Sequence, residues 1–212
     1  MSSATPKERL LSAVVDVALA GGITDLSLRA IAEAAGTSHR MLIHHFGSRE
    51  GLLVEVIRAV EERQRSILGG LETENAGVPE DMAFQFWGHL RSPELAPQER
   101  LFFEVYGQAL QGRQWARPLL DGIVENWVGP VAATFEAVGA SPATARIVAR
   151  LSVAVGRGLL LDVLATGDDE EVDAAMRYFL DMVYAHPLVQ PGNASQPATQ
   201  PVGDDCRPTQ PT

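Results

Sequence analysis

The chain has a single cysteine and no long apolar run, and each scarcity excludes a class of protein. Cys206 is alone among 212 residues, so no internal disulfide can form and a disulfide-stapled secreted domain is excluded. No stretch reaches the roughly 18 apolar residues of a membrane span, and the first residues, MSSATPKERLL, lack a signal-peptide core. We therefore expect a cytoplasmic protein without a membrane partner.

The chain also lacks an excess of positive charge, because its net charge is −10. Its two parts differ, however. Residues 1–70 contain eight Lys and Arg against eight Asp and Glu, a net charge of zero, whereas residues 71–212 contain nine against nineteen, a net charge of −10. Local charge steers binding more than the total does, so an acidic C-terminal part is compatible with an N-terminal part that binds DNA.

Enzyme and metal-site motifs are missing as well. Residues 156–158, Gly-Arg-Gly, lack the third glycine of a dinucleotide loop, residues 47–51 lack the central serine of a nucleophile elbow, and no HExxH is present. Adjacent His44 and His45 point to different helix faces, and no cysteine or carboxylate cluster accompanies them or His39. We expect no enzyme, no cofactor and no metal site.

Helical periodicity is what the sequence has in abundance, and no clear β alternation interrupts it. The spacing of apolar residues predicts an all-α protein with helices over residues 7–21, 49–69, 79–90, 97–111, 115–138, 142–165 and 170–185, in addition to two short helices between the first two. Pro130 should kink or divide its helix, because its ring displaces the carbonyl four residues back. Residues 188–212 are rich in Pro, Gln, Thr and Gly, so we expect a disordered tail.

Residues 26–53, LSLRAIAEAAGTSHRMLIHHFGSREGLL, read as two short helices joined by a tight turn, with a third helix starting behind them. Ser27 and Ser38 are placed to cap the two short helices, and Gly36 supplies the left-handed conformation that ends the first. Leu42 and Phe46 are spaced to anchor the second helix inward. This capped pair predicts a helix-turn-helix.

The outer surface of the second helix carries the residues expected to meet DNA, which are His39, Arg40, Met41, Ile43 and His44. The N-terminal residues of such a helix reach base edges in the major groove, and Arg40 can make the bidentate bond to guanine that reads sequence. Ser48 is placed to cap the following helix, where Arg49 can neutralise a phosphate.

The run SLRAIAEAAGTSHRMLIHHFGSREGLL resembles the DNA-binding domain of the TetR (tetracycline-repressor-like) family over roughly residues 7–55. The resemblance implies that base contacts come from Arg29, His39, Arg40, Met41 and His44. It implies that His45 and Arg49 contact the DNA backbone, and that Thr37 and Ser38 in the turn also belong to the DNA-binding residues. Two residues depart from the family. Ile43 stands where a tyrosine usually bonds to phosphate and cannot donate that bond, and Arg49 replaces a more usual lysine but keeps its charge.

The resemblance also implies a domain organisation: a helix-turn-helix domain over residues 1–48, a helical effector-binding and dimerisation domain over residues 49–187, and the tail. The segment that lines an effector pocket in TetR-like proteins holds most of the large aromatics here, and we expect Met82, Phe86, Trp87, Phe102, Phe103, Tyr106 and Trp127 to line one, with Trp115 nearby. Tyr106, Gln108, His89 and Glu104 are the expected polar groups. A simple core would have the same aromatic spacing.

The last two predicted helices are apolar on more than one face, and such helices must be buried on more than one face. Val172, Met176, Phe179 and Val183 form one stripe, which Leu180 and Met182 widen, and residues 148–160 are apolar nearly all round. The surplus predicts a homodimer through a four-helix interface, as in the family. A monomer would need other helices to cover these faces.

The sequence thus predicts a regulator that binds double-stranded operator DNA as a homodimer. We expect a repressor that a small apolar or aromatic effector releases from DNA by shifting the spacing of the recognition helices. A ligand that strengthens DNA binding is the alternative mechanism. A small helical ligand-binding protein without DNA activity is the rival function, and it would leave Arg40 and Arg49 without a purpose.

Overall fold

A computed structural model describes residues 4–21, 23, 25–74, 79–187 and 189 of the chain. Over these residues it is all-α, as predicted, with the following elements: α1 (Pro6–Gly21), α2 (Leu28–Ala34), α3 (His39–Phe46), α4 (Arg49–Glu74), α5 (Pro79–Leu90), α6 (Ala96–Leu110), η1 (Arg117–Leu120), α7 (Glu125–Ala137), α8 (Pro142–Thr166) and α9 (Asp169–Tyr184). Within the described residues no helix is long and apolar enough to cross a membrane.

Most predicted helices are found within a residue or two of their expected ends, but two predictions are wrong. The helix that follows α3 does not stop at Gly69 and runs on to Glu74. The helix expected over residues 115–138 is two elements, η1 and α7, because Gly122 adopts a φ of +75° that a continuing helix does not allow. Pro130 lies inside α7, and the helix is not divided there.

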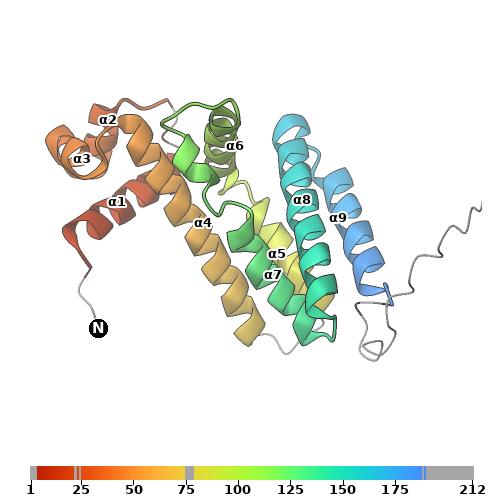
Figure 1. The fold of residues 1–212 in the computed structure, drawn as a ribbon. Coiled ribbons are helices and arrows are strands. Elements are labelled where there is room, and N and C mark those ends of the chain that lie inside the picture. The colour runs from red at the N-terminus through yellow and green to blue at the C-terminus, as the bar shows by residue number, and fades with distance from the viewer. Residues whose placement is uncertain (1–3, 22, 24, 75–78, 188, 190–212) are drawn as a thin grey trace, which may run out of the picture.

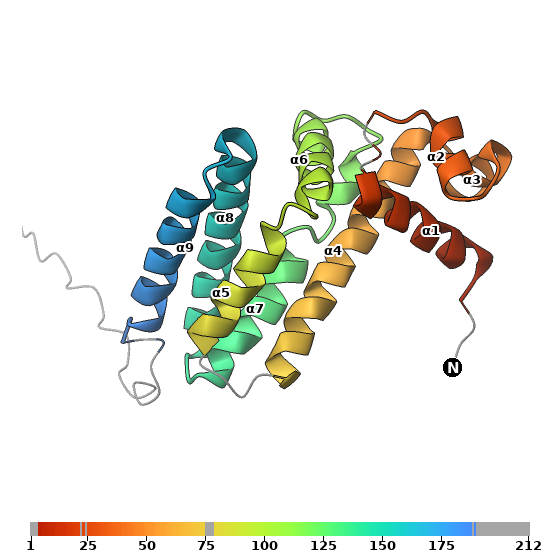
Figure 2. The same cartoon turned by 180° about the vertical axis from the view of Figure 1, so that it is seen from behind.

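The helices form a small N-terminal group and a larger body, and α4 belongs to both (Figure 1). Helices α1, α2 and α3 cluster around the start of α4, which then runs along the body. Seen from either side, α5 and α7 lie between α4 and the α8–α9 pair (Figure 2). The body is therefore a bundle of α-helices packed beside α4.

The N-terminal helices and α6 share one apolar core. Fully buried members of this core come from α1, α2, α3, α4 and α6, with Val14, Ile31, Leu42, Leu52 and Val105 all at 0% exposure. The buried amide of Gln98 on α6 also donates a hydrogen bond of 3.0 Å to the carbonyl of Ala18 on α1. The predicted DNA-binding helices are thus fastened directly to the body.

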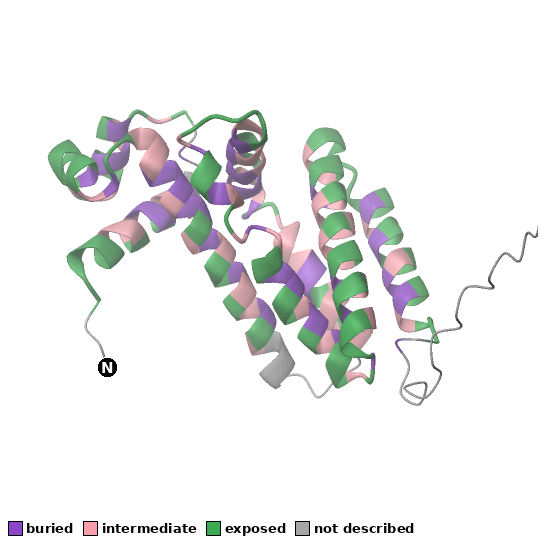
Figure 3. Ribbon diagram, viewed as in Figure 1, coloured by how far each residue is buried: buried purple, intermediate pink, exposed green. Residues whose placement is uncertain are grey.

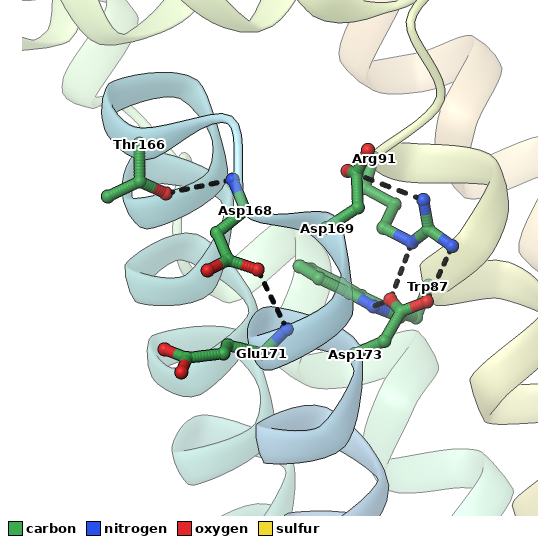
Figure 4. Close-up of polar contacts among 7 residues, drawn as sticks. All are labelled: Trp87, Arg91, Thr166, Asp168, Asp169, Glu171 and Asp173. Atoms are coloured by element: carbon green, nitrogen blue, oxygen red, sulfur yellow. Dashed lines mark hydrogen bonds and ion pairs between the residues drawn. The ribbon is translucent and has the colours of Figure 1, made fainter.

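Polar contacts close the body on its other side, where α5 meets α9 (Figure 4). The Trp87 indole donates to an Asp173 carboxylate oxygen at 2.8 Å, and the Arg91 guanidinium pairs with the same carboxylate at 2.6 Å. The Asp168 side chain caps α9 by accepting from the backbone N–H of Glu171. These contacts fix α9 against α5.

Of the predicted tail, only Val189 lies within the described residues. It is 2% exposed and packs in a core cluster with residues of α7, α8 and α9, among them Val128 and Val183. The apolar core therefore extends one residue into the segment that the sequence predicted to be disordered. The disorder predicted for 188 and 190–212 lies outside the described residues.

Candidate functional site

Helices α2 and α3 form the predicted capped pair. The Ser27 hydroxyl accepts from the N–H of Ala30 at 3.2 Å, and the Ser38 hydroxyl accepts from the N–H of Met41 at 3.3 Å. Gly36 has a φ of +64°, which the turn between the helices requires. The helix-turn-helix thus depends on bonds that each span three residues of sequence.

Helix α3 buries one side and exposes the other. Leu42 is 0% exposed and Phe46 9% exposed, whereas Met41 and Ile43 are about two-fifths exposed. His39, Arg40 and His44, together with Arg29 on α2, are also exposed, while Thr37, His45 and Arg49 are half-buried. The predicted base-reading residues are therefore all accessible, and we call this set (Arg29, His39, Arg40, Met41, His44) the recognition surface.

Arg49 has a structural contact that the sequence did not predict. Its Nε donates a hydrogen bond of 3.0 Å to the carbonyl of Leu26, just before α2. Ser48 caps the same end of α4 by accepting from the N–H of Gly51 at 3.0 Å, as expected. Arg49 therefore ties the start of α4 to the segment that leads into α2, whatever contact it makes with DNA.

A cavity of about 150 Å³ lies inside the body, between helices α4 to α9. Five of the seven residues expected to line a pocket are on its wall: Met82, Phe86, Trp87, Phe102 and Trp127. Phe103 and Tyr106 are not. Phe103 packs into the core beside Phe102, and Tyr106 stacks on Phe102 with ring centroids 5.4 Å apart. Trp115 is also absent from the wall and packs in the core of the N-terminal group.

The polar groups of the cavity differ from those expected. None of Tyr106, Gln108, His89 and Glu104 lines it, although His89 reaches it indirectly through a hydrogen bond of 2.7 Å to Gln64. The polar groups on the wall come mainly from other helices, and they are Glu61, Gln64, Glu99, Thr134, Ser152, Arg157 and Tyr184.

A signal for two of these residues was present in the sequence. Gln64 lies between Val60 and Leu68 on the apolar stripe of α4 and is 3% exposed. Glu99 lies three residues before Phe102 on the inward face of α6 and is 8% exposed. Polar side chains at apolar positions of a helix are buried, and buried polar groups require partners.

Burial raises the pKa values of both acids on the wall. Glu61 has a side chain that is 14% exposed; it accepts a hydrogen bond from the Trp127 indole and lies 3.8 Å from Arg65, and these contacts offset only part of the effect of burial on its pKa. Burial, with a smaller contribution from the charge of Glu61, raises the pKa of Glu99 to about 8, against the lowering effect of Arg157. Glu99 is therefore largely protonated at neutral pH.

Arg157 is the cation on the cavity wall. Its guanidinium donates to the carbonyl of Ile123 at 2.6 Å and lies over the rings of Phe102 and Tyr106, 5.3 and 5.6 Å from their centroids. In the part of the chain that the structure describes, no group of three His, Cys, Asp or Glu side chains could hold a metal ion. The cavity wall thus combines aromatic rings, two acids and one arginine.

Helix α8 is exposed along much of the side seen in Figure 3, and both α8 and α9 carry exposed large apolar residues. Ile147, Leu151 and Leu161 on α8 are 50–64% exposed, and Tyr178 and Met182 on α9 are 73% and 55% exposed. We call these five residues the outer apolar face. The stripe predicted on α9 lies mostly elsewhere, because Val172, Met176 and Val183 are buried inside the chain.

Comparisons with known proteins agree with this architecture. Residues 10–56 match the family model described as bacterial regulatory proteins of the tetR family. A transcriptional regulator from Rhodococcus sp. has a similar structure, with 22% identity, a TM-score of 0.66 and coverage of 85% of this chain and 96% of its own. A TetR transcriptional regulator from Legionella pneumophila has 19% identity, a TM-score of 0.61 and coverage of 86% and 99%.

A third similar structure is Thermus thermophilus FadR, a TetR family transcriptional repressor in complex with lauroyl-CoA, with 15% identity, a TM-score of 0.60 and coverage of 90% of this chain and 100% of its own. A search of curated protein sequences gives no match. The predicted resemblance is confirmed: residues 10–56 match the TetR family, and the chain has the fold of TetR-family transcriptional regulators.

Proposed function

We propose that the protein is a dimeric transcriptional repressor that binds double-stranded operator DNA and is released from it by a small apolar or aromatic effector. The observation that carries the proposal is the recognition surface on a capped helix-turn-helix, with Arg40 exposed in the first turn of α3. A side chain at that position can reach base edges when the helix enters the major groove. We propose no catalytic role.

The proposed dimer forms through the outer apolar face. Along α8, residues 147, 151, 154, 158, 161 and 165 repeat at helical spacing, all are exposed, and each is Ile, Leu, Ala or Gly. Two such helices from each subunit can pack as a four-helix interface related by a two-fold axis. A dimer would place two copies of α3 on two half-sites and so double the few phosphate contacts that one copy makes.

We propose that residues 1–48 bind DNA and that residues 49–187 bind the effector and form the dimer. Coupling between them has a direct route. Glu99 lines the cavity, and the neighbouring residue Gln98 holds α1 through the carbonyl of Ala18. Helix α4 likewise carries Glu61 on the cavity wall and begins beside the helix-turn-helix. A ligand that moves α4 or α6 would therefore change the population of the DNA-binding geometry.

The recognition surface is tested by Arg40→Ala in the full chain. Binding to DNA from the gene's own upstream region should weaken by roughly 10- to 100-fold, while binding to random DNA changes little, because a guanine contact is worth about 1–3 kcal/mol of discrimination. Fluorescence anisotropy with both DNAs measures this. Arg100→Ala is the control, since Arg100 is an exposed arginine on α6. Equal operator affinity in both variants would refute the proposed contact.

The dimer is tested by Leu151→Glu, which places a charge in the outer apolar face. We expect sedimentation equilibrium to show monomers and operator affinity to fall with the loss of the second half-site. Leu110→Glu is the matched control, because Leu110 is 66% exposed on α6, outside that face. A Leu151→Glu variant that remains dimeric would exclude this interface.

A further inference from the structure

We propose that the cavity binds a small aromatic amine in its cationic form, with the ring among Phe86, Phe102 and Trp127 and the ammonium group between Glu61 and Glu99. This inference rests on the proposed function, since it names the chemical class of the effector. Three features of the cavity support the inference: the two acids on its wall, the aromatic rings around them, and the contacts that Arg157 already makes within the protein.

The rings make a site for a flat apolar body. Phe86 and Trp127 lie 6.0 Å apart between centroids, both are 8% exposed, and both line the cavity together with Phe102. A cavity of about 150 Å³ is also the size that, in an engineered apolar site, holds one benzene molecule. The space therefore suits one aromatic ring with a short polar arm.

Glu99 is the group that points to a charged partner. Its side chain is 8% exposed and lines the cavity, and none of the described residues donates a hydrogen bond to its carboxyl group. A carboxyl group on a cavity wall that makes no hydrogen bond within the protein can bond to a donor that enters the cavity. Glu61 lies on the adjacent wall from α4 and adds a second carboxyl.

The arginines near the cavity are less available to bind an anion, because they already have partners within the protein. Arg157 already donates to Ile123 and lies over two rings, and Arg65 pairs with Glu61 and Glu62. A carboxylate in the cavity would also lie beside two acidic side chains. An ammonium group meets both acids and the faces of the rings, where a cation is further stabilised by the ring quadrupole.

Binding of a cation in the cavity should be coupled to the release of a proton. Glu99 is largely protonated at pH 7, and an ammonium group beside it favours its ionised form. The charged groups that act on Glu99 are Glu61 from α4 and Arg157 from α8. Arg65 pairs with Glu61, His89 is one hydrogen bond away from the wall through Gln64, and Tyr184 from α9 also lines the cavity. Amine binding should therefore release up to one proton per site, and affinity should rise with pH until Glu99 is ionised.

The experiment compares three probes of nearly the same shape on the purified full chain: benzylammonium, benzyl alcohol and benzoate. Isothermal titration calorimetry at pH 7, in two buffers of different ionisation enthalpy, measures affinity and proton release together. We expect benzylammonium to bind at least tenfold more tightly than either other probe and to release protons. Tighter binding of benzyl alcohol or benzoate, or no proton release, would overturn the inference.

Variants locate the ammonium group. Glu99→Gln keeps the shape of the side chain and should weaken benzylammonium at least tenfold, reduce proton release to the part that Glu61 contributes and leave benzyl alcohol unchanged. Glu104→Gln is the matched control, because Glu104 is exposed on the same helix. Both variants should fold, since neither introduces a charge or a cavity. Unchanged benzylammonium affinity in Glu99→Gln would overturn the assignment.

The effector class and the proposed function can fail separately. If benzylammonium binds as expected and leaves operator affinity unchanged, the ligand chemistry stands and the effector-controlled release of DNA does not. If neutral or acidic aromatics release the operator and amines do not bind, the protein remains a ligand-responsive regulator and the amine inference is wrong.

Discussion

The helix-turn-helix takes its exposed contact residues mainly from one eight-residue helix, whereas the cavity takes its wall from helices α4 to α9, between Glu61 and Tyr184 in sequence. The caps that shape α2 and α3 each join residues three apart. The polar end of the cavity, in contrast, joins Glu61, Glu99 and Arg157 from three helices. Local bonds define the first region and long-range packing defines the second.

This difference has a consequence for how each region can vary. The predicted base-reading residues on the exposed side of α3 can change without disturbing its buried side, which consists of Leu42 and Phe46. A change in the cavity wall alters burial and charge for residues on several helices at once, as the effect of Glu61 on the pKa of Glu99 illustrates. The two regions should therefore respond differently to substitution.

The largest expected effect comes from Leu42→Ala, which removes a fully buried side chain from α3. Loss of a buried leucine lowers the unfolding free energy by about 2–5 kcal/mol. Most of this destabilisation should fall on the N-terminal helices. Hydrogen exchange should show reduced protection in α1 to α3 and retained protection in α7 to α9. Met41→Ala, at the exposed neighbouring position, should cost less than about 0.5 kcal/mol. Equal loss of protection in both regions would contradict a local effect of the substitution.

The buried carboxyl group of Glu99 in the cavity wall should make the unfolding free energy depend on pH. The folded-state pKa of Glu99, about 8, lies above its ordinary value of 4.5, so the folded protein holds a proton that the unfolded chain releases. Unfolding free energy should therefore fall as pH rises from about 5 to 8, by at most about 1.4 kcal/mol per pH unit, and level off above 8.

Glu99→Gln should flatten this slope and make the variant more stable than the original protein at pH 8. Urea unfolding at pH 5, 6, 7 and 8 measures the effect. Burial raises the pKa of Glu61 as well, so part of the slope should remain. Glu104→Gln should keep the full slope, and parallel curves for Glu99→Gln and the original protein would show that Glu99 is not protonated in the fold.

The smallest effect is expected from Ile43→Tyr, which supplies the hydroxyl that TetR-like proteins usually carry at this position. Ile43 is 39% exposed, so the larger side chain meets no core, and stability should stay within about 0.5 kcal/mol. One added hydrogen bond to phosphate, worth about 1 kcal/mol, should raise operator affinity by a few fold. Anisotropy titrations at several salt concentrations should show an unchanged slope, since no charge is added. A loss of affinity would place residue 43 away from the DNA backbone.

Much of the fold followed from local patterns. Ser27 and Ser38 were placed as caps from their spacing to the apolar residues behind them, and both accept the expected bonds. The prediction of one helix over residues 115–138 is wrong because the apolar pattern continues through Gly122. The positive φ of Gly122, which ends the helical path there, depends on the path of the surrounding chain. Its position shows that periodicity locates a helix face better than a helix end.

The cavity was only half predictable. Aromatic spacing indicated five residues of the wall, but it could not separate Phe102, which faces the cavity, from Phe103 and Tyr106, which pack beside it. The acids were missed because their importance depends on burial. Glu99 is an ordinary glutamate in sequence, and only the packing of α4, α6 and α8 gives it an apolar environment and an arginine neighbour.

The sequence by itself determined the all-α class, the capped helix-turn-helix and the exposed arginine of α3, because each depends on residues within a few positions of one another. The tertiary structure decided which side chains surround the cavity, where its two acids meet and which face of α8 and α9 is left uncovered. Those features depend on how helices distant in sequence pack together, and periodicity fixes the face of a helix without fixing its neighbour.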